Sequence, residues 1–189
     1  MEYGDKFQAI TELKGTQCVL RQPDDAIAPG LFEAIDESRS DLYEYMPWSN
    51  ESMDELAGFL ETTRKQHQSG TGLHLAVFSK RSNRLLGAIG LVHLSPFTPK
   101  GEVGYWIRST ETGNGYATDA LRTLERYCRD ELGFVRLDAC VATSNLASQA
   151  VLRKCGFEQE GLKRKAMLCH GNWLDLALMG KLLDGGGGA

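Results

Sequence analysis

The stretch that decides the fold covers residues 102–131 and has the sequence EVGYWIRSTETGNGYATDALRTLERYCRDE. Its first seven residues are mostly aromatic or branched, which predicts a buried strand. Residues 109–115 are rich in turn formers and include Gly113 and Gly115, which predicts a loop. From Tyr116 onward apolar residues recur at helical spacing, which predicts a helix that ends before Gly133. The central unit is therefore a strand, a glycine loop and a helix.

A unit of this kind is suited to bind an anion. The first turn of a helix has backbone N–H groups without helical partners, and it carries the positive end of the helix dipole. Glycine has no Cβ, so the backbone can approach a phosphate closely. The same spacing also occurs in ordinary strand-to-helix connections, which remain the alternative on spacing alone. We predict a phosphate cradle formed by Gly113, Asn114, Gly115, Tyr116, Ala117 and Thr118.

Two other phosphate-binding motifs fit this loop poorly. A nucleoside-triphosphate loop has Lys and then Ser or Thr after its last glycine, whereas Tyr116 and Ala117 stand there. A dinucleotide fingerprint has a third glycine, which Ala117 or Thr118 would have to replace. Its acidic residue would be Asp138, which lies inside a predicted strand instead of at the strand's end. The nucleotide interpretations therefore rank below a different phosphate ligand.

Two segments resemble the GNAT superfamily of N-acetyltransferases. The residues YWIR at 105–108 and GNGYATDAL at 113–121 resemble the loop that binds the pyrophosphate of acetyl-coenzyme A. The residues NLASQAVLRKCGF at 145–157 resemble the second signature of the same superfamily. One departure is Thr110, which stands where the family usually has Gln or Arg, and Arg108 is the candidate substitute for this phosphate contact.

The resemblance covers residues 16–183 and implies an α/β (α+β) fold. The GNAT fold has a mixed, mostly antiparallel seven-stranded sheet with a central splay and helices on both faces. We expect one domain over residues 1–184 and a flexible glycine tail at 185–189. The pattern predicts helices over 24–38, 52–68 and 145–155, the second with a Ser52–Glu55 capping box. It predicts further strands over 16–21, 73–79, 85–94, 135–141, 158–163 and 173–183.

The composition is that of a soluble globular chain. Of 189 residues, 42% are hydrophobic and 24% are charged. The net charge of −4 does not indicate a broad nucleic-acid-binding face. The five cysteines lack a C-x-x-C pair, which favours reduced thiols in the cytoplasm, and the four histidines have no metal-ligand spacing. We expect neither a signal peptide nor a membrane span.

Acetyl transfer to an amine needs a base, a donor for the thioester oxygen and a proton for the leaving thiolate. Glu102 is the candidate base, because it opens the central strand on the same face as Gly104 and Trp106 and matches the family's position for this role. The resemblance implies that the backbone of Trp106 and Ile107 binds the pantetheine arm and the oxygen. Gly104 would mark the strand distortion that frees this backbone.

The second signature supplies two more candidates. Asn145 and Ser148 stand at a helix start, where both residues also suit purely structural capping roles. The resemblance implies that Asn145 contacts pantetheine and that Ser148 protonates the thiolate. Tyrosine has this role in other branches of the family, but none stands near this point of the sequence.

The acceptor side resembles the Rim-type branch, the ribosomal-protein N-terminal acetyltransferases. The residues YEYMPW at 43–48, GYW at 104–106 and NWLD at 172–175 carry this resemblance. It implies transfer to the α-amine of a Ser or Ala terminus, with acceptor contacts from Tyr45, Trp48, Glu102 and Trp173. An α-amine has a pKa of about 8, so one weak base is sufficient.

Three other functions remain open at this stage. The chain could acetylate a small amine (a polyamine, an aminoglycoside or an amino acid), or bind an acyl-CoA as a non-catalytic sensor, or be an unrelated nucleotide-binding module. The sequence does not name the amine acceptor, because loops on a shared scaffold set it. It does not choose between a monomer and a homodimer.

Overall fold

The computed structural model describes residues 3–50, 52–94 and 97–183, and the described chain is built around one sheet. The sheet has eight strands in the order β1-β2-β3-β4-β5-β6-β8-β7. All neighbours are antiparallel except β5 and β6, which confirms the mixed, mostly antiparallel class. The strands are β1 (Leu13–Lys14), β2 (Cys18–Arg21), β3 (Leu73–Ser79), β4 (Leu85–Val92), β5 (Lys100–Ile107), β6 (Arg136–Ala142), β7 (Glu158–Cys169) and β8 (Asn172–Leu182).

The expected number of seven strands is one too low. The additional strand, β1, has only two residues, and two residues are too few to show an alternating pattern. The predicted glycine tail at 185–189 lies outside the described residues.

Four of the described helices, Ala28–Glu37, Met53–Ser69, Tyr116–Asp130 and Leu146–Lys154, correspond to predicted helices. The short helices Gly4–Gln8 and Arg39–Tyr43 are not among the predicted ones. The central helix begins at Tyr116 as predicted, and Ser52 and Glu55 form the predicted capping box. None of the described helices is both long and apolar enough to cross a membrane. The helices are α1 (Gly4–Gln8), α2 (Ala28–Glu37), α3 (Arg39–Tyr43), α4 (Met53–Ser69), α5 (Tyr116–Asp130) and α6 (Leu146–Lys154), with short 3-10 turns η1 (Asp25–Ile27) and η2 (Ser109–Glu111).

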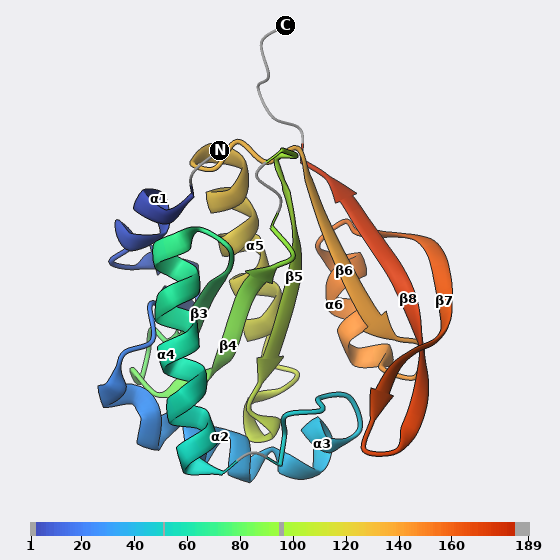
Figure 1. Ribbon diagram of the computed structural model, residues 1–189, viewed down its shortest axis with the longest axis horizontal. Coiled ribbons are helices and arrows are strands. Elements are labelled where there is room, and N and C mark those ends of the chain that lie inside the picture. Colours follow the sequence, from blue (N-terminus) through green and yellow to red (C-terminus); the bar gives the residue numbers. More distant parts are fainter. Residues whose placement is uncertain (1–2, 51, 95–96, 184–189) are drawn as a thin grey trace, which may run out of the picture.

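Helices cover both faces of the sheet, as the fold class implies (Figure 1). On one face α5 and α6 pack on a core that includes Leu121, Leu124 and Val103. On the other face α2, α3 and α4 enclose a smaller core that includes Leu31 and Trp106. Because side chains alternate along a strand, β5 contributes to both cores. The central strand is therefore the one on which the two halves of the molecule meet.

The expected splay lies between β5 and β6. These two strands pair only over three residues each, Lys100–Glu102 with Arg136–Asp138. Beyond this point they diverge like the arms of an inverted V (Figure 1). Strand β6 continues with β8 along its whole length, so the edge of β5 that faces β6 is left open after Glu102.

A carboxylate fixes the start of α5 against β2. Asp119 accepts hydrogen bonds from the backbone N–H groups of Thr16, Gln17 and Cys18, at 2.9, 2.7 and 2.9 Å. Burial acts to raise the pKa of Asp119, but these hydrogen bonds outweigh burial and hold the pKa below its ordinary value. The carboxylate is therefore ionised at neutral pH, and it anchors the helix end that follows the glycine loop.

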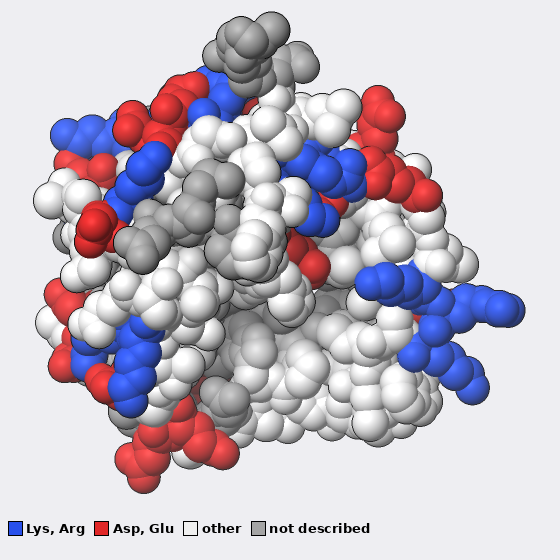
Figure 2. All heavy atoms as spheres, turned by 45° about the horizontal axis from the view of Figure 1, so that its top comes forward, with Lys and Arg blue, Asp and Glu red and all other residues white. Residues whose placement is uncertain are grey.

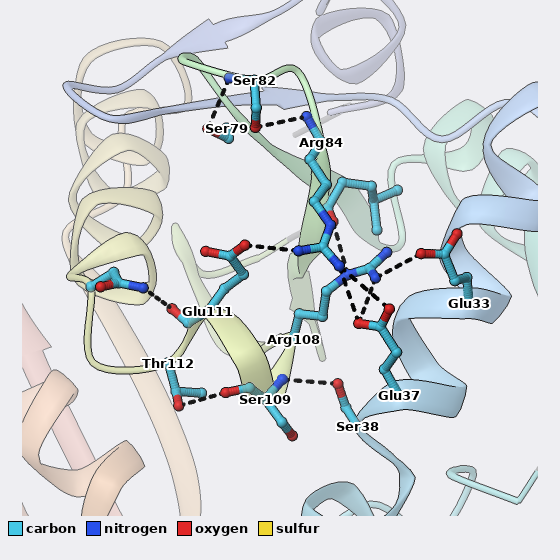
Figure 3. Close-up of polar contacts among 12 residues, drawn as sticks. Glu33, Glu37, Ser38, Ser79, Ser82, Arg84, Arg108, Ser109, Glu111 and Thr112 are labelled. Atoms are coloured by element: carbon cyan, nitrogen blue, oxygen red, sulfur yellow. Dashed lines mark hydrogen bonds and ion pairs between the residues drawn. The ribbon is translucent and has the colours of Figure 1, made fainter.

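A buried arginine fixes the loop from the other side. The guanidinium of Arg108 lies 2.6 Å from Glu37 and 3.0 Å from Glu33, both on α2 (Figure 3). Its side chain is only 2% exposed. Arg84 connects the same Glu37 to Glu111 in the turn η2, at 3.3 and 3.0 Å. This network connects α2 to the end of β5, immediately before the glycine loop.

We expect Arg108→Met to destabilise the protein, because it leaves two carboxylates without their shared cation. The loss should be smaller than that for a fully buried ion pair, since Glu33 is largely hydrated and Glu37 keeps its contact with Arg84. Urea denaturation measures it. Arg129→Met is the matched control, because its pair with Asp130 is solvent-exposed and should contribute little to stability. Equal losses in both variants would contradict a structural role for Arg108.

Candidate active site

The glycine loop has the geometry of an anion cradle. Gly113 and Gly115 have φ of +79° and +86°, in the left-handed region that favours glycine. Gly115 is the N-cap of α5, and no side chain caps this helix end, whereas Ser52 and Asn145 cap α4 and α6. The first N–H groups of α5, at Tyr116, Ala117 and Thr118, are therefore left for a ligand. Uncapped N–H groups at a positive helix end suit a diphosphate.

The expectation that Arg108 contacts phosphate is wrong for its side chain. The guanidinium is buried toward α2, and it also donates to the backbone oxygens of Leu85 and Gly30, at 3.2 and 3.4 Å. Sequence spacing places Arg108 near the loop but does not show that two glutamates four residues apart on α2 face it. In the cradle itself, Asn114 donates from its side chain to the Glu111 carbonyl at 3.3 Å, which stabilises the loop internally.

The open edge of β5 offers backbone groups to a ligand. The N–H of Arg108 donates to the Leu86 carbonyl at 2.6 Å, so Arg108 bonds toward β4. A Cβ on Gly87 would stand 2.2 Å from the carbonyl oxygen of Trp106, so Trp106 is also turned toward β4. Because an antiparallel ladder alternates, Tyr105 and Ile107 direct their N–H and C=O groups into the splay.

Two sequence expectations on this strand therefore change. The backbone of Ile107 faces the splay as expected, but that of Trp106 does not, and Tyr105 takes its place. Gly104 does not mark a distortion, because it stands in regular register opposite Gly90. The sequence pattern places residues on faces of a strand, but only the pairing partner determines which backbone groups are already used.

Ser148 lies beside a tyrosine that sequence analysis missed. Its hydroxyl donates to the Tyr105 hydroxyl at 3.0 Å, and Tyr105 donates in turn to the Ser148 carbonyl at 3.0 Å. Burial raises the pKa of Tyr105 to about 12, so the phenol is protonated at neutral pH. The sequence shows no tyrosine near Ser148, but the fold brings one to it, because β5 and α6 meet across 43 residues of sequence.

Asn145 has the structural role that its position allows. Its side-chain oxygen accepts from the Ser148 N–H at 2.9 Å, which makes it the N-cap of α6. The cap fixes the first turn of α6, on which the Ser148 hydroxyl is carried. A contact of Asn145 with pantetheine stays a prediction.

Glu102 lies at the start of the splay and has a histidine partner. Its carboxylate is 3.2 Å from Nδ1 of His93, and its side chain is 26% exposed. His93 follows β4 with φ of +52° and is largely exposed. Burial raises the pKa of Cys140, and the negative charge of the nearby Glu102 raises it further. The Glu102 carboxylate therefore has a solvent-facing imidazole beside it. The sequence does not predict this contact, because nothing in it indicates the positive φ of His93.

On the α2 and α4 side of β5 lies a cavity of about 310 Å³. Trp48 lines it and packs against Trp106 with ring centroids 6.0 Å apart. Tyr45 is partly buried next to Ser144, just before α6, and burial raises its pKa. Trp173 is 57% exposed on β8 and is not part of the cavity. Of the predicted acceptor residues, the structure thus places Trp48 in the cavity and Trp173 outside it.

The surface around the site carries charges of both signs. Figure 2 shows a hollow between the two halves of the molecule, with basic side chains gathered at one edge. Strand β7, which forms the end of the sheet, exposes Lys163, Arg164 and Lys165. The hollow is therefore flanked by a helical side and a basic sheet edge.

Comparison with known proteins decides the family. The model of the acetyltransferase (GNAT) domain matches residues 17–158. The chain belongs to this family. It is 29% identical over 164 residues to the uncharacterized N-acetyltransferase YoaA of Bacillus subtilis, covering 86% of this chain and 92% of YoaA. It is 24% identical over 159 residues to the ribosomal-protein-serine acetyltransferase of Escherichia coli, covering 82% of this chain and 86% of that enzyme.

The fold agrees with that of a solved Rim-type enzyme. The ribosomal L7/L12 α-N-protein acetyltransferase RimL, solved in complex with coenzyme A, superimposes with a TM-score of 0.85 at 22% identity, covering 92% of this chain and 98% of RimL. The GNAT chain is thus an N-acetyltransferase that uses acetyl-CoA, and Rim-type enzymes are among the proteins that it resembles. The uncapped end of α5 and the open edge of β5 fit a diphosphate and a pantetheine arm.

We expect Gly115→Asp to abolish coenzyme A binding while the fold persists. The new side chain adds a negative charge where the diphosphate would bind, and a like charge costs several kcal/mol, roughly a hundredfold or more in affinity. Calorimetry measures the affinity. Gly133→Asp is the control, because Gly133 has a similar φ of +69° at the other end of α5; its Cβ position is open, whereas a Cβ on Gly115 would stand 3.2 Å from the end of the Gln17 side chain, which can turn away. Unchanged affinity in Gly115→Asp would remove the cradle from the site.

Proposed function

We propose that the GNAT chain acetylates the α-amino group of a protein N-terminus. The observation that carries this proposal is the absence of acidic side chains from the cavity beside the Glu102 strand: the described residues that line it include no Asp or Glu. Polyamines and aminoglycosides carry several ammonium groups, which need carboxylate partners when they leave water. A single α-amine needs one base. Ser or Ala is the terminus that the sequence resemblance indicates.

The donor side is held by backbone groups. Acetyl-CoA, when bound, supplies a thioester whose acetyl group passes directly to the amine. The N–H groups at the start of α5 hold the diphosphate, and Tyr105 and Ile107 pair with the amides of the pantetheine arm as an added strand would. An N–H of this free edge, at Ile107, serves the thioester oxygen as negative charge develops on it.

The proton movements use two separate groups. Glu102 accepts the proton of the amine, directly or through water, and the exposed His93 at 3.2 Å passes it to solvent. Ser148 turns its hydroxyl proton from Tyr105 to the thiolate as the C–S bond breaks, and water returns a proton to the Ser148 oxygen. Tyr105 holds the Ser148 hydroxyl at 3.0 Å and is a positioning residue for this step.

We expect Glu102→Gln to lower kcat by roughly tenfold to a thousandfold, because the amide keeps the size and loses the basicity. The effect should be largest below about pH 8, where most of the α-amine is protonated. Coenzyme A affinity should be unchanged. Glu160→Gln is the control, since Glu160 lies on β7 and pairs with Arg136 of β6. A wild-type pH profile in Glu102→Gln would place the base elsewhere.

The acceptor class is tested by following acetyl-CoA consumption. The panel contains peptides with a free α-amine, the same peptides with a blocked α-amine and an internal lysine, spermidine and an aminoglycoside. We expect turnover only with free α-amines. Acetylation of spermidine or the aminoglycoside but of no peptide would overturn the proposal in favour of a small-molecule enzyme.

Trp48→Ala should raise KM for the peptide far more than KM for acetyl-CoA, because Trp48 lines the acceptor cavity only. Trp173→Ala is the control, since Trp173 is exposed and outside the cavity. Steady-state kinetics with each substrate varied in turn gives both constants. Equal effects on both substrates would make Trp48 a packing residue.

A further inference from the structure

The floor of the cavity is a row of the sheet that has almost no side chains. In the register of the sheet, His74 stands opposite Gly90, and Gly90 stands opposite Gly104. This row therefore crosses β3, β4 and β5 with two glycines side by side. The neighbouring rows on the same face carry Trp106 on one side and Glu102 on the other. The row forms a trough, which we define as His74, Gly90 and Gly104, one row away from the proposed base.

The trough is roofed by apolar side chains from the helices. Leu31 and Ile35 of α2, Phe59 of α4 and Trp48 line it. The cavity volume is about 310 Å³. A water molecule occupies about 30 Å³ in the liquid, so the cavity has room for about ten non-hydrogen atoms. A serine or alanine side chain would leave nearly all of this room empty, in contact with apolar walls.

The cavity is also uncharged near neutral pH. Among its described lining residues only His74 and Tyr105 can titrate. Burial, with a smaller contribution from the neighbouring His67, lowers the pKa of His74 to about 4. Burial raises the pKa of Tyr105 to about 12. Nε2 of His74 donates to the Gln66 side-chain oxygen at 2.9 Å. An ammonium group would lose its hydration here without gaining a partner, whereas an apolar group would not.

We propose that the accepted α-amine belongs to a residue with a bulky apolar side chain, of the size of Leu, Met or an aromatic residue, and that this side chain lies in the trough. The proposal rests on the proposed function, since it names the residue that carries the amine. The amine then stands in the row of Glu102, while the side chain extends over Gly104 and Gly90 toward His74. The Ser or Ala terminus indicated by the sequence resemblance is replaced by a larger one.

Gly104 is the position at which the proposal can be tested. A Cβ built on Gly104 meets no atom within 4 Å, so a side chain there enters empty space. A Cβ on Gly90 would stand 2.3 Å from the Leu73 carbonyl oxygen, so Gly90 cannot be changed without disturbing the sheet. Gly161 of β7 is the matched control, because it is a strand glycine away from the cavity whose Cβ would make an ordinary 3.4 Å contact with Leu178. Valine suits a strand at both positions.

The experiment compares acceptors that differ only in size of the first side chain. Peptides beginning with Ser, Ala, Leu and Phe and otherwise identical are assayed for kcat/KM with wild type, Gly104→Val and Gly161→Val. The small amines 2-phenylethylamine and ethanolamine are assayed alongside, and their binding with coenzyme A present is measured by calorimetry. We expect wild type and Gly161→Val to prefer Leu and Phe over Ser and Ala by roughly tenfold to a hundredfold. Gly104→Val should lose this preference.

Each outcome decides a different claim. A preference for Ser or Ala, or a preference for Leu and Phe that Gly104→Val leaves unchanged, would overturn the trough as a specificity site while the proposed function stands. Acetylation of 2-phenylethylamine but of no peptide would overturn the protein N-terminus as acceptor and support the trough. If 2-phenylethylamine is neither acetylated nor bound more tightly than ethanolamine, and no peptide is acetylated, both proposals fail. Unfolding midpoints of the two variants confirm that the comparison is made on folded protein.

Discussion

The site of this GNAT chain depends on the short pairing between β5 and β6. The two strands share a ladder over three residues each and then separate, which leaves one edge of a central strand without a partner. Buried backbone groups without partners are costly, so an open central edge persists only where a ligand or water can satisfy it. The remaining features of the site follow from this opening. It exposes the backbone of Tyr105 and Ile107, and it leaves room for Tyr105 to reach Ser148 on α6.

The glycine loop beside the opening is anchored by contacts on both of its sides. Asp119 connects the start of α5 to β2, and Arg108 connects the end of β5 to α2. Both are charged groups whose partners come from distant parts of the sequence. These contacts stabilise the residues before and after the glycine loop, while no side chain caps the loop end of α5. The uncapped end of α5 can then be used for binding, since it is not needed to stabilise the helix.

The alternation of β5 separates the two substrates. Residues whose side chains face α5 and α6, such as Tyr105, belong to the donor side, and residues on the opposite face, Glu102, Gly104 and Trp106, belong to the acceptor side. One strand thus positions the groups that we propose for the base, the thioester oxygen and the acceptor side chain. The two glycines of the trough add the empty space that an acceptor would need. A flat strand with ordinary side chains at these positions would close the acceptor side.

The sequence by itself determined the central unit, the start of α5 at Tyr116, the capping box of α4 and the family, because each of these is carried by residues close together in the chain. It also placed Glu102, Gly104 and Trp106 on one face, since alternation along a strand is a local property. Tertiary structure decided the rest. Arg108 turned toward α2, Tyr105 met Ser148, His93 came to Glu102, and Trp173 stayed outside the cavity. Each of these outcomes is set by a partner from another element, by the register between strands or by the turn that follows a strand. A pattern within one segment contains no information about which distant group faces it.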